Sequence, residues 1–214
     1  MNANGRVLDQ ELLVVPDFAQ TEEVLGLRKA FDVAVTADRQ APINALRVRN
    51  FSARTEVPAK GIVAVRGGSE SRIIVTIRSR IISMIRDAFA AQEIRPEWTV
   101  FSEMRTGDSM QLHADAERQQ PAGWEENHTP WRTHVGLLYL CTAGADFHGG
   151  DLVLPGIGRT IQPSSGLLVS FPSGRNHRHR VTTVESGARL SFVVWFTRDA
   201  SRGEKGWPVE TALT

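Results

Sequence analysis

The sequence contains very little cysteine: Cys141 is the only one among 214 residues. A single cysteine excludes an internal disulfide framework and is typical of a protein from a reducing compartment. An excess of charge of one sign is missing as well, because 25 lysines and arginines are balanced by 24 aspartates and glutamates. This balance provides no general field that would attract nucleic acid, so we expect no nucleic-acid partner.

Long apolar runs are also absent. No stretch approaches the roughly 20 apolar residues that a membrane-spanning helix needs, and the first 15 residues lack the apolar centre of a secretory signal. Hydrophobic residues make up 41% of the chain and charged residues 23%, which is ordinary for a globular protein. We therefore expect a cytoplasmic protein with no membrane partner, and the sequence leaves the oligomeric state open.

The chain divides into two zones of different residue composition, within what we expect to be a single domain, residues 1–214. Residues 1–95 are expected to form a supporting region of helices and strands. Within it, residues 11–15 predict a strand, Thr21 is expected to cap a helix that runs to about Phe31, and residues 71–90 form the best amphipathic helix in the chain.

Residues 96–200 are expected to form the second zone, a β-rich core. Short runs rich in valine, leucine, phenylalanine and tryptophan alternate there with glycine, proline and serine. Eight strands are expected, at 98–104, 110–115, 133–141, 151–154, 159–162, 166–171, 179–185 and 189–197. Strands at this spacing are typical of a sandwich or barrel. Residues 116–132 are too polar for a strand, and we expect a loop that acts as a substrate lid.

One histidine and one aspartate have the sequence spacing of a metal-binding pair. His113 and Asp115 lie two residues apart in an expected strand, so both side chains should face one side. Together they supply two ligands of the two-histidine, one-carboxylate triad of non-haem iron oxygenases. The histidines His128, His134 and His148 are expected at the surface rather than as the third ligand, and a separate cluster of Asp146, His148 and Asp151 stays open.

His177 and His179 are the strongest candidates for the third ligand, and Arg189 separates them. If residues 185–187 turn a hairpin, the backbones of His179 and Arg189 lie about 13 Å apart along the strands. An extended arginine and a five-carbon diacid span that gap, whereas His177 lies about 7 Å further away. This geometry favours His179 and places His177 at the rim. Arg178 and Arg180 are expected to point outward.

Five collinear blocks resemble the Fe(II)/2-oxoglutarate-dependent dioxygenases, and their prolyl-4-hydroxylase-like branch in particular. They are QLHAD (111–115), VGLLYLC (135–141), DFHGGDLVLP (146–155), IQPSSGLLVSFPS (161–173) and HRVTTVESGARLSFVVWF (179–196). The resemblance implies a mainly β (α+β) fold with a double-stranded β-helix, or jelly-roll (cupin-like), core and N-terminal supporting helices. It also implies that His113, Asp115 and His179 are catalytic residues that bind Fe(II), and that 2-oxoglutarate and O2 are cosubstrates.

The resemblance extends to the cosubstrate pocket. It implies that Arg189 pairs with the far carboxylate of 2-oxoglutarate, that the Tyr139 hydroxyl helps to hold it, and that Ser191, which shares the face of Arg189, joins the contact. Many members of the prolyl-4-hydroxylase-like branch carry a tyrosine where this chain has Met104. That departure places Met104 among the candidate substrate residues and weakens any transfer of prolyl specificity.

The expected activity is hydroxylation of an unactivated C–H bond with release of succinate and CO2. We favour a small-molecule substrate, such as an amino acid or another metabolite, because the chain contains little beyond the barrel and its helices. The candidate substrate residues on the polar loop are Trp124, Trp131 and Arg132, since tryptophan and arginine are common ligand anchors. Two alternatives are a peptidyl, prolyl-type hydroxylase and a non-catalytic cupin-like binding protein.

Overall fold

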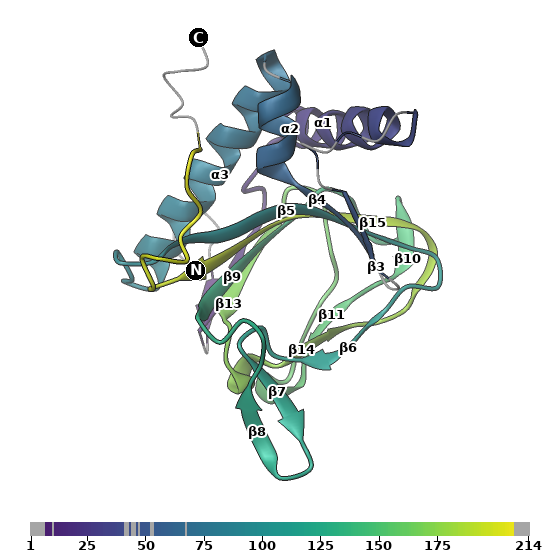
Figure 1. Cartoon of the computed structure of the whole chain (residues 1–214). Helices are drawn as coiled ribbons and strands as arrows, with labels where there is room; N and C mark the ends of the chain where they lie inside the picture. The colour runs from purple at the N-terminus through teal and green to yellow at the C-terminus, as the bar shows by residue number, and fades with distance from the viewer. Residues whose placement is uncertain are drawn as a thin grey trace.

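Two antiparallel sheets face each other in the computed structural model, which describes residues 7–9, 11–40, 43, 46, 48–51, 54–66 and 68–207 (Figure 1). Among these residues the larger sheet has nine strands in the order β1-β2-β13-β9-β15-β5-β4-β3, with β10 paired to β15. The bounds are β1 Val7–Asp9, β2 Leu12–Val15, β3 Arg49–Phe51, β4 Arg54–Pro58, β5 Arg95–Arg105, β9 Arg132–Tyr139, β10 Phe147–Gly149, β13 Leu168–Pro172 and β15 Val184–Thr197.

The smaller sheet lies across the open face of the larger one. Its order is β12-β11-β14-β6, with bounds Arg159–Ile161, Leu152–Leu154, His179–Val181 and Met110–His113. Short 3-10 helices, η1 (Pro155–Ile157) and η2 (Arg175–His177), come before β12 and β14. This mainly β architecture with a jelly-roll core confirms the expected fold class.

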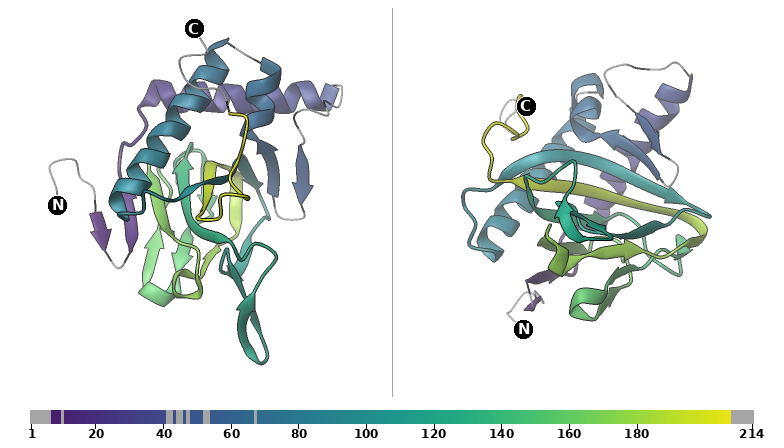
Figure 2. Two further views of the ribbon diagram at one scale, coloured as in Figure 1. Left: turned by 60° about the vertical axis from the view of Figure 1, so that its left-hand side comes forward. Right: turned by 60° about the horizontal axis from the view of Figure 1, so that its bottom comes forward.

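Three helices cover the outer face of the larger sheet, as Figures 1 and 2 show: α1 (Thr21–Gln40), α2 (Ala59–Arg66) and α3 (Gly68–Ala88). Phe31 of α1 packs on Phe101 of β5, with ring centroids 5.8 Å apart, and Phe101 packs on Phe192 of β15 at 5.0 Å. A Cβ added to Gly136 on β9 would lie 2.6 Å from Ile85 Cδ1, so a larger residue there would force the Ile85 side chain of α3 to move.

Strand alternation divides the larger sheet into a helix side and a barrel side. Phe192 on β15 belongs to the helix side, whereas the alternating residues Ser191, Val193 and Trp195 line a cavity inside the barrel. Both faces are therefore covered, which explains why β15 is apolar over most of its length rather than strictly alternating. In the described part of the chain, no helix is long and apolar enough to cross a membrane.

The structure corrects several expectations about local elements. The helix that begins at Thr21 continues to Gln40, and β1, β3, β4, β10 and α2 had not been expected. Residues 116–132 are not an irregular loop, because β7 (Glu117–Gln120) and β8 (Gly123–Glu126) form a hairpin that extends away from the barrel (Figures 1 and 2). The strands of this ribbon are mostly polar, and cross-strand pairs such as Arg118 with Glu125 support it.

Residues 185–187 do not turn a hairpin either. They lie inside the continuous strand β15, which pairs with β5 and β9, whereas β14 pairs with β6 and β11 in the other sheet. The assumed register between His179 and Arg189 was therefore wrong. The chain crosses from one sheet to the other between β14 and β15, so the two residues approach the cavity from opposite walls.

Candidate active site

His113 and His179 lie side by side on two paired strands of the smaller sheet. The two residues are register partners on β6 and β14, and their ring centroids lie 4.3 Å apart. The Nδ1 atom of His113 lies 2.8 Å from the Gln111 carbonyl, and that of His179 lies 3.1 Å from the His177 carbonyl. A carbonyl only accepts, so both Nδ1 atoms carry the proton and both Nε2 lone pairs are left for a ligand.

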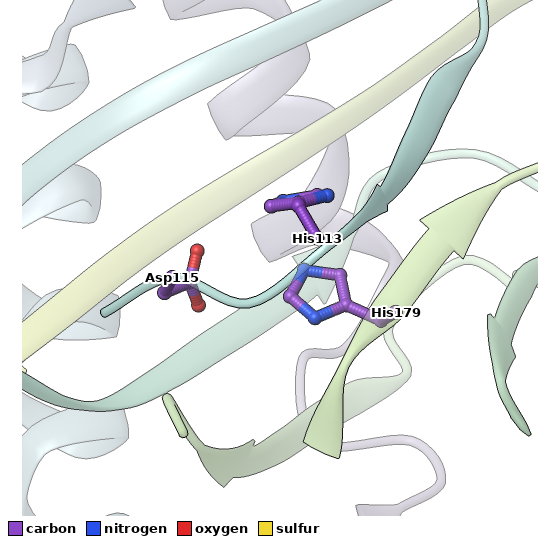
Figure 3. A group of neighbouring side chains, drawn as sticks. All are labelled: His113, Asp115 and His179. Carbon is purple, nitrogen blue, oxygen red and sulfur yellow. The ribbon is translucent and has the colours of Figure 1, made fainter. Parts of the chain in front are cut away.

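Asp115 lies just beyond the end of β6 and completes a group of three (Figure 3). One ligand atom from each of His113, Asp115 and His179 lies within 4.8 Å of the others. Asp115 is 7% exposed, and its Oδ2 atom is buried without a hydrogen-bond partner in the described structure. A buried carboxylate oxygen without a partner is costly unless a cation satisfies it, so these residues fit a divalent metal such as iron.

Burial also prepares His179 to act as a ligand. Burial, together with the neighbouring His113 ring, lowers the pKa of His179 to about 4, while Asp115 acts in the opposite direction. The imidazole is therefore neutral at physiological pH, which is the protonation state that binds metals. Phe171 supports the ring from the side, with centroids 4.9 Å apart.

Arg189 lies in the same cavity and is only 3% exposed. Its Nε atom donates to the Gly150 carbonyl at 3.0 Å, and Nη2 donates to the Tyr139 hydroxyl at 3.4 Å. No carboxylate of the described residues forms an ion pair with it. A buried guanidinium without an anionic partner calls for an anion from outside the chain.

Neighbours of Arg189 shape the same end of the cavity. The Met104 sulfur lies 3.8 Å from Arg189 Nη1, and Ser191 lines the cavity while its hydroxyl donates to the Ser102 carbonyl at 3.4 Å. Burial raises the pKa of Tyr139, although Arg189 opposes the shift, so the phenol stays protonated and can donate a hydrogen bond. The structure thus brings Met104, Tyr139, Arg189 and Ser191 together.

The cavity has a volume of about 430 Å³ and runs past the three candidate ligands to Trp195 and Arg132. The Arg132 guanidinium lies over the Trp195 ring, 4.4 Å from its centroid, and its Nε atom is 2.9 Å from a Glu97 oxygen. On β15, Trp195 follows Arg189 by six residues on the same face, which is about 20 Å of extended strand. The two arginines therefore lie towards opposite ends of the cavity.

The two tryptophans of the expected lid do not reach this cavity. Trp124 lies on β8 opposite Gln119, and Trp131 lies beneath Arg202, whose Cζ is 3.9 Å from the ring centroid. Neither lines the cavity. Trp124 belongs to the hairpin, which points away from the barrel (Figure 1), and the Trp131 ring contacts Arg202 of the C-terminal segment. Of the three expected residues, Arg132 alone faces the cavity.

The remaining histidines occupy other positions. His128 lies at the cavity wall, and His148 is exposed and hydrogen-bonded to Ser186. His134 and His177 are buried, against Phe89 and Phe171 respectively, so the expectation that they lie at the surface or rim was wrong. Within the described ranges, no group of three ligands other than His113, Asp115 and His179 is close enough for a metal, which excludes the Asp146, His148 and Asp151 cluster.

Sequence reasoning missed three polar residues at the site. Arg54 of β4 lines the cavity beside Met110, and Asn127 and Thr129 lie on the wall next to Asp115. The pattern Asn-X-Thr after a polar run is a signal for a side-chain-capped turn, but nothing in the sequence ties that turn to Asp115. Arg180 points outward as expected, whereas Arg178 is half-buried.

Known proteins share both the sequence pattern and the fold. Residues 99–197 match the model of the 2OG-Fe(II) oxygenase superfamily. Prolyl 3-hydroxylase 2 of Gallus gallus is 33% identical over 106 residues, which is 45% of this chain and 15% of that protein. A PKHD-type hydroxylase of Gloeothece citriformis is 34% identical over 87 residues, covering 38% of this chain and 39% of that protein. This chain thus spans well under half of these relatives.

Among solved structures, a viral collagen prolyl hydroxylase from Paramecium bursaria Chlorella virus-1 superposes with a TM-score of 0.60 at 14% identity, over 92% of this chain and 97% of that one. Identity this low establishes only the shared fold. The matched sequence, the jelly-roll core and the group of two histidines and one aspartate agree in making residues 99–197 of this chain similar to the 2OG-Fe(II) oxygenase superfamily, whose members use Fe(II), 2-oxoglutarate and O2.

Proposed function

We propose that this protein is an Fe(II)- and 2-oxoglutarate-dependent hydroxylase in which His113, Asp115 and His179 hold the iron. The observation that carries the proposal is the arrangement of these three side chains. Their ligand atoms lie within 4.8 Å, both imidazoles have Nδ1 engaged, and Asp115 Oδ2 is buried without a protein partner. A facial set of two nitrogens and one oxygen leaves coordination positions open for cosubstrates.

Arg189 is the proposed anchor for the far carboxylate of 2-oxoglutarate. A guanidinium keeps its charge when buried and offers a planar fork to a carboxylate. The Gly150 carbonyl holds the Nε side, so the Nη atoms remain directed towards Tyr139 and Met104. In this proposal the Tyr139 hydroxyl donates to the same carboxylate, and the Ser191 hydroxyl turns from the Ser102 carbonyl to join it. The buried setting strengthens each contact.

Iron, 2-oxoglutarate and O2 would together supply the oxidising chemistry, yielding succinate, CO2 and a hydroxylated product. The protein residues orient the reactants and exclude water. The apolar residues Leu137, Val193 and Leu152 line the cavity around the candidate ligands. They leave the buried polar groups as the dominant contacts for a bound cosubstrate.

A small molecule remains the favoured substrate. The cavity volume of about 430 Å³ is in the range that encloses a small ligand. Arg132 is the proposed substrate contact, since it lines the cavity on the side away from Arg189 and its guanidinium is held by Glu97 and Trp195. The competing proposal is a peptidyl, prolyl-type substrate, which the names of the prolyl hydroxylase relatives favour.

Succinate formation from 2-oxoglutarate tests the proposal and separates the substrate classes. Purified protein is supplied with Fe(II), 2-oxoglutarate and air, together with separate pools of amino acids, other small metabolites and short proline peptides. We expect one pool to raise the rate of succinate formation at least tenfold over the pool-free rate. Metal binding without succinate from any pool would instead support the alternative of a non-catalytic binding protein.

A further inference from the structure

The segment after the β7–β8 hairpin is hydrogen-bonded to the backbone of Asp115. The Thr129 hydroxyl donates to the Asp115 carbonyl at 2.8 Å, and the Asn127 amide donates to the same oxygen at 3.0 Å. The Asn127 amide also lies 3.3 Å from the Ala114 carbonyl. Two side-chain donors therefore use both lone pairs of one carbonyl, next to a candidate metal ligand.

The two donors also hold each other in place. The Asn127 Oδ1 atom accepts from the Thr129 backbone N–H at 2.7 Å, so the amide cannot flip without losing this bond. The Asn127 backbone N–H donates to the Ala116 carbonyl at 3.2 Å, and Thr129 is only 7% exposed. Residues 114–116 and 127–129 thus form one closed unit, which we call the clamp.

Asp115 needs such a support more than the two histidines do. His113 and His179 belong to paired strands, and a backbone carbonyl orients each ring. Asp115 follows the end of β6, outside the strand ladder, and its Oδ2 atom has no protein partner in the described structure. The place of this carboxylate is therefore set mainly by its backbone, and metal affinity depends on ligands that are held in position before the metal arrives.

We infer that Asn127 and Thr129 are positioning residues that hold Asp115 at coordinating distance from the metal. The inference rests on the proposed function, because it assumes that Asp115 is a metal ligand. The same bonds close the base of the β7–β8 hairpin, which joins residue 116 to residue 127. A role confined to the hairpin would affect stability and leave metal affinity unchanged.

The experiment measures the Kd for Mn2+ by calorimetry, together with the unfolding midpoint, for matched variants of the full chain. Thr129→Val removes the hydroxyl at nearly constant shape, and Thr129→Ser restores it. Asn127→Asp keeps the acceptor for the Thr129 N–H and removes the donor. The control is Ser170→Ala, because the Ser170 hydroxyl is fully buried and donates to a backbone carbonyl, that of Val135, at 2.7 Å, while Ser170 itself neither lines the cavity nor contacts Asp115.

We expect Thr129→Val and Asn127→Asp to weaken Mn2+ binding about tenfold or more, as is common for residues that support metal ligands. Thr129→Ser should stay within twofold of wild type, and Ser170→Ala should lower the midpoint and leave the Kd unchanged. The inference is overturned if Thr129→Val and Asn127→Asp lower only the midpoint, as Ser170→Ala does. Absence of Mn2+ binding in the wild type would instead contradict the proposed metal site itself.

Discussion

His113 and His179 are direct register partners on β6 and β14, so the distance between their rings is fixed by the spacing of two neighbouring strands. Side chains opposite each other in an antiparallel pair have Cβ atoms about 5 Å apart. That spacing lets two imidazoles converge on one ion, and the ladder becomes irregular only beyond this pair, between His179 and Val181. The site is thus a consequence of sheet pairing, and Asp115 is the member that depends on other contacts.

Removal of the Arg189 charge should affect 2-oxoglutarate and spare the metal. Arg189→Met leaves the apolar stem and removes the buried fork, so the cosubstrate carboxylate loses its main partner. Losing one member of a buried charged pair costs about 2–5 kcal/mol, and we expect the KM for 2-oxoglutarate to rise at least thirtyfold. The Kd for Mn2+ should stay within twofold. An unchanged KM would show that another residue binds the cosubstrate.

Gly150→Ala should displace Arg189 by steric contact, without any change of charge. Gly150 has φ +67°, and an added Cβ would lie 2.8 Å from a Phe147 ring carbon and 3.1 Å from Arg189 Cδ. Gly144→Ala is the matched control, because Gly144 has φ +82° with no atom within 4 Å of the added Cβ. Both variants should lose about 1 kcal/mol of stability from the left-handed backbone.

The KM for 2-oxoglutarate distinguishes these two glycine variants. It should rise several-fold in Gly150→Ala and stay at the wild-type value in Gly144→Ala. Equal KM values in the two variants would mean that the position of Arg189 does not depend on the turn at Gly150.

The buried His134 should make stability depend on pH. Burial lowers its pKa to about 4, against 6.5 in the unfolded chain, and Arg198 adds to the shift. Between these values the unfolded state binds more protons than the folded state, so stability falls as pH decreases from 6.5 towards 4. At pH 5 the loss from this residue is about 2 kcal/mol.

Urea unfolding of metal-free protein at pH 7 and pH 5 measures that loss. The decrease in unfolding free energy between the two pH values should be smaller in His134→Gln than in wild type, because glutamine does not titrate. His179 has the same low pKa and contributes equally to both proteins. An identical decrease in wild type and variant would show that His134 is not the group that titrates.

The C-terminal segment should depend on one buried ion pair. Arg78 of α3 and Glu204 lie 3.1 Å apart, both nearly inaccessible, and Thr99 of β5 bonds to each of them. Glu204→Gln leaves a buried guanidinium without its counter-ion, so we expect a loss of about 3 kcal/mol in unfolding free energy. The exposed Arg198–Glu93 pair provides the control, since Arg198→Ala should cost less than 1 kcal/mol. Similar losses in both variants would contradict this account.

Strand composition and spacing are local properties, so they predicted a sandwich or barrel, and the family resemblance implied the jelly-roll core. His113, Asp115, His179 and Arg189 were named from their spacing and family resemblance, and the structure brings all four to one cavity. The register between the last two strands was wrong because the sequence Glu-Ser-Gly is compatible both with a turn and with a long strand. Only the pairing of this segment with β10, in a strand that continues along β5 and β9, distinguishes them.

The surroundings of the site were harder to predict for a different reason. Trp131 was expected at the cavity, but its ring lies under Arg202, a residue 71 positions away in the sequence. The bonds from Asn127 and Thr129 to Asp115 likewise depend on how a hairpin closes between them. Such contacts arise from tertiary packing, and no pattern of hydropathy or spacing along the chain encodes them.

The most direct test of the central claim is the rate of succinate formation by Asp115→Ala in the presence of Fe(II), 2-oxoglutarate and air. Asp199→Ala is the control, because Asp199 is an exposed carboxylate that bonds only to its neighbours. If Asp115 holds the iron with His113 and His179, Asp115→Ala should retain less than a hundredth of the wild-type rate while Asp199→Ala retains it fully. An undiminished rate in Asp115→Ala would contradict the proposed triad.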